Sequence, residues 1–412
     1  MKLVKLDLET IPLGHPLPFI LRSATGVLLA KKGYVVQSKD ELQQMALRGM
    51  SLCVDTDESG ESHRAYVGKL HSMVREGKTL GTIASTQFVT DGKGPDTTAP
   101  TITDPTARPN WHDIQTRASN GLRQPESTSA MTRLFQLHAD LTLLTQRQTD
   151  ATLFALMHLS AGETRLYSAT HAMLVSVVCM LAARTVLQWP EDRVNSLGLS
   201  ALTMNISMTE LQDQLAQQSL PLSSAQVEAI DGHSQKSVDM LKKLGIQDPD
   251  WLEAVRHHHD RSPGPLTGRP PAQQMARLIQ RADIFGARMA PRATRFPLPS
   301  TAAMQGSYFD EDKKVDEAGA ALVKAVGMYA PGSYVKLASG EVAVVTRRGA
   351  TPSTPRVSVV ISRQGMAMAE PPPRDTARPD FKITAGLPAR EVKVKLPLER
   401  LLRDATDYAV NG

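Results

Sequence analysis

Hydrophobic and polar positions divide the chain into three segments of different pattern. Residues 1 to about 57 alternate short apolar runs, such as GVLLAKKG, with polar positions and one helical stretch, which predicts a small α/β module. From about 130 to 330, apolar residues recur at helical spacing in one stretch after another. After residue 330, the alternation about a Ser-Gly turn in SYVKLASGEVAVVTRR predicts a β-hairpin, and RVSVVISR adds a third strand.

The helical pattern is the longest, so we expect a mainly α protein built around a helical bundle. The run from Glu163 to Val186 is apolar on nearly every side, as expected for a central helix. Ser223 and Gln226 have the spacing of a capping box, and so do Ser38 and Glu41.

Stretches rich in Pro, Gly and polar residues mark the boundaries between these modules. TDGKGPDTTAPTITDPTARPN has no apolar periodicity and indicates a flexible linker, and a helix is expected before it at about 62 to 77. EPPPRDTARPD indicates a second loop, and EVKVKLPLERLL a strand and a short helix. The predicted division is therefore an N-terminal regulatory or docking module at 1–85, a linker at 86–129, a helical domain at 130–330 and a β-rich module at 331–412.

Composition narrows the functional classes. The chain has 412 residues, enough for two or three domains, with 4 % aromatic residues and 17 methionines, a balance that favours packed helices. Its two cysteines form no CxxC unit, which excludes a disulfide framework and a cysteine-rich zinc site. The net charge of +5 is spread out and predicts no nucleic-acid partner. No signal peptide or sufficiently long apolar span is evident, so we expect a cytoplasmic protein without a membrane partner.

Ionisable residues recur on the predicted inner faces of the helices. His233 lies three positions after Ile230, at helical spacing on one predicted helix. The next helix ends in the run His257, His258 and His259, and Asp283 lies on the helix after that. Burying such groups costs free energy unless they are hydrogen-bonded or bound to metal. Helical bundles build metal sites from inward histidines and carboxylates, so this pattern makes a metal site a candidate.

These residues give the chain its resemblance to a known family. YSATHAMLV, LSSAQVEAIDGH, the His-rich run and QRADIFGA follow one another as in the HD-GYP family, HD-domain phosphohydrolases that hydrolyse cyclic di-GMP. The resemblance covers nearly the whole chain and extends to GVLLAKKG and YAPGSYVKLASGEVAVV. It implies ligand positions and, in RATR, two phosphate-binding arginines, with His257 as an extra residue. The implied ligands are His171, His233, His258, His259 and Asp283, and the arginines are Arg292 and Arg295.

The sequence departs from the family at the centre of the chemistry. Where the family has ALLHDIGK, this chain has ALTMNISM, so Met204 replaces a ligand histidine, Asn205 the aspartate that bridges two metal ions, and Met208 a phosphate-binding lysine. Asparagine carries no negative charge and methionine offers only a soft thioether, so both are poor ligands for a two-metal centre. The Gly-Tyr-Pro loop is replaced by SPGPLTG, and Gly286 stands where an aspartate is usual.

Two interpretations of the surviving ligands remain. They could hold one divalent transition ion, iron, manganese or zinc, or they are remnants hydrogen-bonded to one another inside the bundle.

Three functions follow from the resemblance and its losses. The first is a catalytically impaired, degenerate HD-GYP protein that acts as a regulatory or interaction module in bacterial cyclic di-GMP signalling, with cyclic di-GMP, a signalling protein or a second copy of the chain as partner. The second is a metal-dependent phosphodiesterase with a mononuclear site. The third is a structural scaffold that binds no nucleotide.

Overall fold

The computed structural model divides the chain into two compact units, Met1–Gly94 and Pro95–Gly412, each of which is described by itself. It describes residues 3–6, 17, 20–30, 34, 36, 38, 41, 45, 51–55, 101–102, 109–127, 129–162 and 164–406.

The described part of the first unit contains a small antiparallel sheet. Its four strands lie in the order β1-β4-β2-β3, and Leu21, Leu52 and Val54 are buried in its core. The backbone N–H of Glu41 donates to Ser38 Oγ at 3.2 Å, one half of the predicted capping box. The helix expected at 62–77 lies outside the described residues. The strands are β1 (Leu3–Lys5), β2 (Leu21–Ser23), β3 (Leu28–Ala30) and β4 (Leu52–Asp55).

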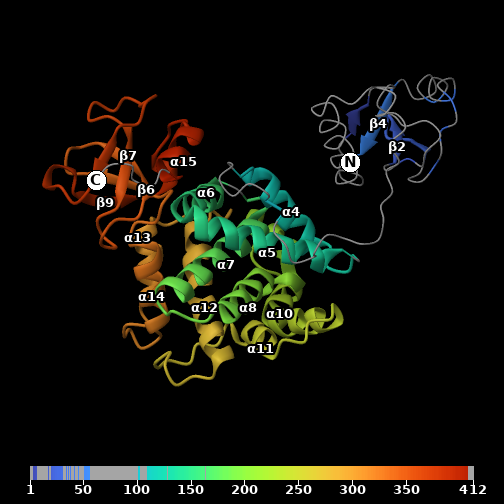
Figure 1. The fold of residues 1–412 in the computed structure, drawn as a ribbon, viewed down its shortest axis with the longest axis horizontal. Coiled ribbons are helices and arrows are strands. Elements are labelled where there is room, and N and C mark those ends of the chain that lie inside the picture. The colour runs from blue at the N-terminus through green and yellow to red at the C-terminus, as the bar shows by residue number, and fades with distance from the viewer. Residues whose placement is uncertain are drawn as a thin grey trace. The chain divides into compact units, whose positions relative to one another are not determined.

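The second unit is dominated by helices packed around one central helix (Figure 1). This agrees with the mainly α fold expected from the sequence. The helices are α4 (Trp111–Arg123), α5 (Ala130–Arg147), α6 (Thr149–Gly162), α7 (Tyr167–Thr185), α8 (Glu191–Thr203), the 3-10 turn η2 (Ile206–Met208), α9 (Thr209–Gln217), α10 (Ser224–Lys243), α11 (Pro249–His257), α12 (Pro271–Met289), α13 (Ser300–Tyr308) and α14 (Glu317–Val326).

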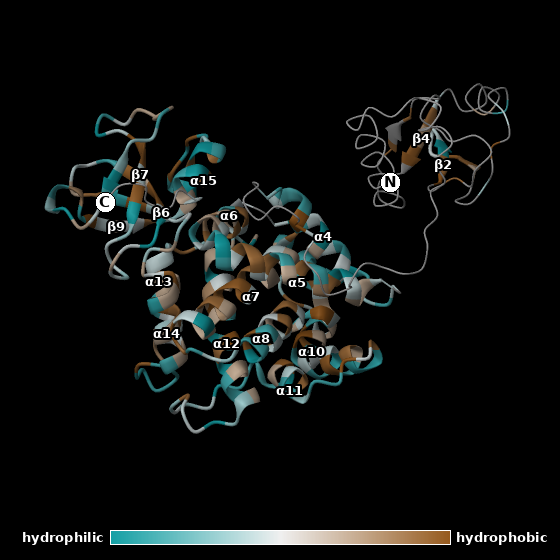
Figure 2. Cartoon of the chain, in the orientation of Figure 1, coloured by the Kyte–Doolittle hydropathy of each residue, from teal (hydrophilic) through white to brown (hydrophobic). Residues whose placement is uncertain are grey.

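Helix α7 is the core of this unit. It is buried from Tyr167 to Ala183 and contacts α4, α6, α8, α12 and α14, and Figure 2 shows its apolar surface enclosed by the other helices. Among the described residues it is the one helix long and apolar enough to cross a membrane, but 89 % of its apolar window is buried inside the protein. Such burial is typical of a core helix.

The expectation of a linker across 86–129 is wrong for part of that range. Trp111–Arg123 forms α4, which packs against α5 and α7. Its buried residues Trp111, Ile114 and Ala118 recur at helical spacing, a pattern that the Pro-rich stretch before it obscured. The backbone N–H groups of Thr101 and Ile102 also donate to the Asp140 carboxylate of α5, at 2.7 and 2.9 Å. The helical domain therefore includes residues that the sequence assigned to the linker.

The C-terminal residues form a second sheet, with strand order β8-β7-β6-β5-β9 and α15 packed on β6 and α6. The predicted hairpin is present as β5 and β6, with Gly340 in its turn at φ +86°, and RVSVVISR supplies β7. Two expectations are wrong: the Pro-rich loop contains β8, and EVKVKL forms no strand, because β9 takes the free edge of β5 instead. The elements are β5 (Tyr334–Leu337), β6 (Val342–Arg347), β7 (Arg356–Ile361), β8 (Pro373–Asp375), the 3-10 turn η3 (Pro379–Phe381), β9 (Ile383–Leu387), the 3-10 turn η4 (Ala389–Glu391) and α15 (Leu398–Thr406).

Candidate metal centre

Three histidines from two helices converge on one point. His233 lies on α10, His258 caps the C-terminal end of α11, and His259 follows it. Their ligand atoms lie within 4.8 Å of one another, and His233 Nε2 is 3.2 Å from the Nε2 of both His258 and His259. We call these three residues the histidine triad.

Helix ends fix the position of the triad. Helix α10 begins with a complete capping box between Ser223 and Gln226, as the sequence predicted. Helix α11 is capped at its start by Asp248, whose carboxylate accepts from two backbone N–H groups. The sequence suggested that His259 lies at the end of α11. That expectation is wrong, because α11 ends at His257 and His259 lies in the turn after it.

Hydrogen bonds to backbone carbonyls set the tautomers of two triad rings. His233 Nδ1 donates to the carbonyl of Ile230, and His258 Nδ1 donates to the carbonyl of Val255 at 2.6 Å. A carbonyl only accepts, so both Nδ1 atoms carry the proton and, in a neutral ring, Nε2 presents a lone pair. Burial, followed by the neighbouring His259, lowers the pKa of His258 to about 3, and burial also lowers the pKa values of His233 and His259.

Neutral rings whose lone pairs face one another at 3.2 Å repel unless a cation lies between them. A zinc ion bound at about 2.0–2.1 Å in tetrahedral geometry separates two ligand nitrogens by roughly 3.3 Å. Histidine ligands commonly donate their second ring nitrogen to a carbonyl, as His233 and His258 do here. The triad therefore fits one transition-metal ion.

A second pair of predicted ligands lies beside the triad. His171 Nε2, from α7, is 2.7 Å from Asp283 Oδ1, from α12. Burial alone would raise the pKa of Asp283, but the hydrogen bond and charge of His171, together with the charges of His258 and His259, lower it to about 2. Asp283 is therefore an anion, and its charge acts on the whole triad.

One of the two predicted phosphate-binding arginines, Arg292, connects to this pair through Tyr167, a residue that the sequence analysis did not single out. Arg292 Nη2 donates to the Tyr167 hydroxyl at 2.9 Å, and the Tyr167 ring stacks on His171 with their centroids 5.4 Å apart. Arg295 donates to the backbone carbonyl of Ala287. A stacking partner one helical turn before a ligand histidine is a signal that sequence spacing could have given.

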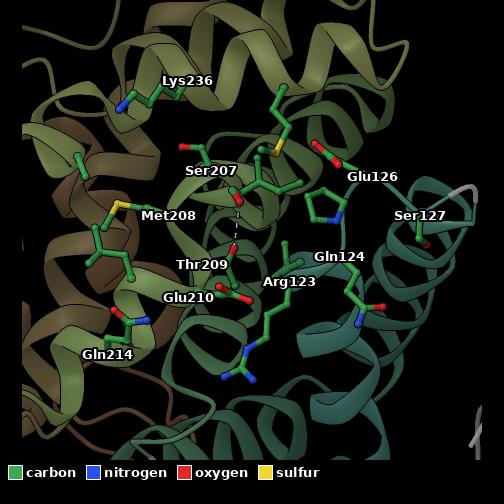
Figure 3. A pocket seen from close by; sticks show the side chains of 16 residues that line it. Arg123, Gln124, Glu126, Ser127, Ser207, Met208, Thr209, Glu210, Gln214 and Lys236 are labelled. Carbon is green, nitrogen blue, oxygen red and sulfur yellow. Dashed lines mark hydrogen bonds between the residues drawn. The ribbon is translucent and has the colours of Figure 1, made fainter. Parts of the chain in front are cut away.

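The segment that departs from the family lies at the end of α8. Met204 is only 1 % exposed, and the buried Oδ1 of Asn205 has no hydrogen-bond partner among the described residues. Met208 lines a cavity of about 700 Å³ together with Ser207 and with Lys236 of α10 (Figure 3). Ser207, which also lines this cavity, donates to the backbone carbonyl of His233, but the triad residues are not among the cavity's lining residues.

The remaining residues of the His-rich run point elsewhere. His257 Nε2 lies 3.1 Å from Glu253 on the surface of α11, and Asp260 accepts from the backbone N–H and hydroxyl of Ser262. The extra histidine is thus not part of the triad.

Comparisons with known proteins found two that resemble this chain. No protein-family profile matches it. The structure of Bd1817, an HDGYP protein from Bdellovibrio bacteriovorus, aligns with 78 % of this chain and 98 % of its own at a TM-score of 0.43 and 14 % identity. The cyclic di-GMP phosphodiesterase PA4108 of Pseudomonas aeruginosa is 27 % identical over 208 residues, 48 % of each chain. These findings support the resemblance of the chain to the HD-GYP family. The chain matches about half the length of this curated relative.

The five predicted ligands fall into two groups. His233, His258 and His259 form one cluster, whereas His171 and Asp283 are bonded to each other. The resemblance noted in the sequence implies that Met204 and Asn205 occupy the positions of the family's remaining histidine and bridging aspartate. The described ligand atoms that cluster are those of the triad, and their spacing fits one ion.

Proposed function

We propose that this chain is a catalytically impaired HD-GYP protein that acts as a regulatory module in cyclic di-GMP signalling and keeps one metal position. The observation that carries the proposal is Asn205, whose buried Oδ1 has no described partner at the position of the bridging carboxylate. Asn205 can offer a neutral oxygen but no negative charge, and the neighbouring Met204 is buried and offers no imidazole.

The retained metal is a divalent transition ion, iron, manganese or zinc, held by the histidine triad. Three imidazoles and one open position make a common transition-metal site, and the exposed His259 leaves one side accessible. When bound, the ion would supply positive charge for an anionic ligand. Asp283 would stay with His171 and neutralise part of the charge of the site.

Cyclic di-GMP is the proposed ligand because it is the substrate in the name of PA4108. Arg292 and Arg295 would contact its phosphates, and the Tyr167 hydroxyl orients Arg292. The cavity that Met208 lines is connected to the triad through the bond from Ser207 to the His233 carbonyl and, at about 700 Å³, is in the size range of small-molecule sites.

A second candidate is a working phosphodiesterase with a mononuclear centre. The observation in its favour is the same triad, because three histidines with an open coordination position can activate a metal-bound water. The loss of the lysine at Met208 removes a phosphate contact and disfavours this candidate.

Turnover of cyclic di-GMP separates the two candidates. Purified protein with added Mn²⁺ or Fe²⁺ is expected to show no hydrolysis, and the triple reversion Met204→His, Asn205→Asp, Met208→Lys is expected to gain activity that His233→Ala removes. Turnover by the unaltered protein that His233→Ala abolishes would establish the mononuclear enzyme instead. Calorimetric titration with cyclic di-GMP then tests ligand binding, and absence of binding would favour a scaffold.

A further inference from the structure

A chain of buried hydrogen bonds leads from a carboxylate cluster to the turn that carries the triad. Arg277 and Gln280 lie one turn apart on α12, and each is 3 % exposed. Arg277 Nη1 donates to Gln280 Oε1 at 2.7 Å, and Gln280 Nε2 donates to the backbone carbonyl of Asp260. Asp260 directly follows His259, so this bond fastens the turn at its last residue.

At the other end of this series of hydrogen bonds, two carboxylates hold Arg277. Arg277 Nε lies 2.8 Å from Asp316 Oδ2, and Arg277 Nη2 lies 2.8 Å from Glu311 Oε2. The other oxygen of Asp316 accepts from the backbone N–H of Gly319 and so caps α14. Arg277 has little freedom to rotate, because charge-assisted bonds fix its guanidinium from more than one side.

The amide of Gln280 uses both of its ends, one as an acceptor and the other as a donor to the turn. Its amide oxygen is occupied by the arginine, so its NH₂ group is the part that faces the turn. The same turn is closed by the Asp260 N–H, which donates to the His257 carbonyl at 2.9 Å. The backbone of residues 257–260 is therefore held on both sides, which restricts where the rings of His258 and His259 can lie.

We propose that Gln280, held by Arg277, is a positioning residue of the metal site and fixes the turn that presents His258 and His259. This inference rests on the proposed metal function of the triad. Groups that orient metal ligands typically contribute 10- to 100-fold to affinity. Here Gln280 donates to the backbone carbonyl of Asp260 rather than to the ring of a ligand histidine.

Two substitutions separate the bonds of Gln280. Gln280→Leu removes both bonds, whereas Gln280→Glu keeps an acceptor for Arg277 and loses the donor to Asp260. Both variants are expected to bind Co²⁺ and Zn²⁺ about 10- to 100-fold more weakly than the unaltered protein. The visible absorption of bound Co²⁺ should also shift as its geometry relaxes. Gln274→Leu is the matched control, because Gln274 donates from the same helix to the carbonyl of Arg269, away from the triad.

Hydrogen exchange of the metal-free proteins tests the positioning role without relying on metal. Peptides covering residues 255–262 should exchange faster in both Gln280 variants than in the Gln274 control, at temperatures where thermal melts show all proteins folded. Unchanged exchange and metal affinity within twofold in both Gln280 variants would overturn the proposal. If the unaltered protein binds no metal, the proposed metal function is refuted, and so is the role of Gln280 in metal binding. Faster exchange in the Gln280 variants would then still show that Gln280 holds the turn, so the two failures can be told apart.

Discussion

Acid should destabilise this protein through a histidine remote from the triad. His138 on α5 is 6 % exposed, and its Nε2 lies 3.3 Å from Asn195 Oδ1, while Nδ1 is buried without a described partner. Burial lowers its pKa from 6.5 to about 4; the hydrogen bond to Asn195 opposes the shift, and the charge of Arg184 adds to it. The folded state therefore resists protonation that the unfolded chain accepts.

The sign and size follow from the two pKa values. Above about pH 6.5 neither state binds the proton and the full stability is present. As the pH falls from 6.5 towards 4, the unfolded state alone gains a proton, so the free energy of unfolding decreases by up to about 1.4 kcal/mol per pH unit. Between pH 7.5 and 4.5 the loss from His138 amounts to about 2.5 kcal/mol. Below pH 4 both states bind the proton and the loss levels off.

Urea unfolding at several pH values measures this contribution. The unaltered protein is compared with His138→Gln, and subtracting the two curves removes the effect of other titrating groups. His112→Gln, at an exposed position of α4, controls for the loss of one imidazole. Stability curves of the unaltered protein and His138→Gln that stay parallel within about 0.5 kcal/mol from pH 7.5 to 4.5 would refute the reasoning.

Three further predictions concern the site and the packing around it. Dialysed protein should retain one equivalent of transition metal by elemental analysis. At a free metal concentration one hundred times the dissociation constant, the metal should raise the free energy of unfolding by about 2.7 kcal/mol and so raise the unfolding temperature. His233→Ala should remove both effects. Tyr167→Phe keeps the ring that stacks on His171 but loses the hydroxyl that holds Arg292, so calorimetry should show weaker cyclic di-GMP binding with metal content unchanged. Gly319→Ala should cost at least about 2 kcal/mol in urea unfolding, because its Cβ would lie 2.1 Å from a backbone carbonyl oxygen, whereas Gly162→Ala, with nothing within 4 Å, should not destabilise the protein.

The sequence by itself determined the helical elements and the candidate ligands. Capping residues such as Ser223 and the apolar run of α7 act over a few neighbouring positions, so they can be recognised without knowing the fold. The prediction that Asn205 cannot act as a bridging carboxylate also came from the sequence, because residue identity alone decides that its side chain carries no negative charge.

Only the tertiary structure decided how these residues combine. The sequence indicated five ligands without separating the triad from the pair of His171 and Asp283, since the grouping depends on how α7, α10, α11 and α12 pack together. The pairing of β9 with β5 and the bond from Gln280 to the turn after α11 join elements that are distant in the chain. The stacking of Tyr167 on His171 depends on side-chain direction. Local patterns specify each helix and its ends, whereas contacts between helices specify the chemistry they enclose.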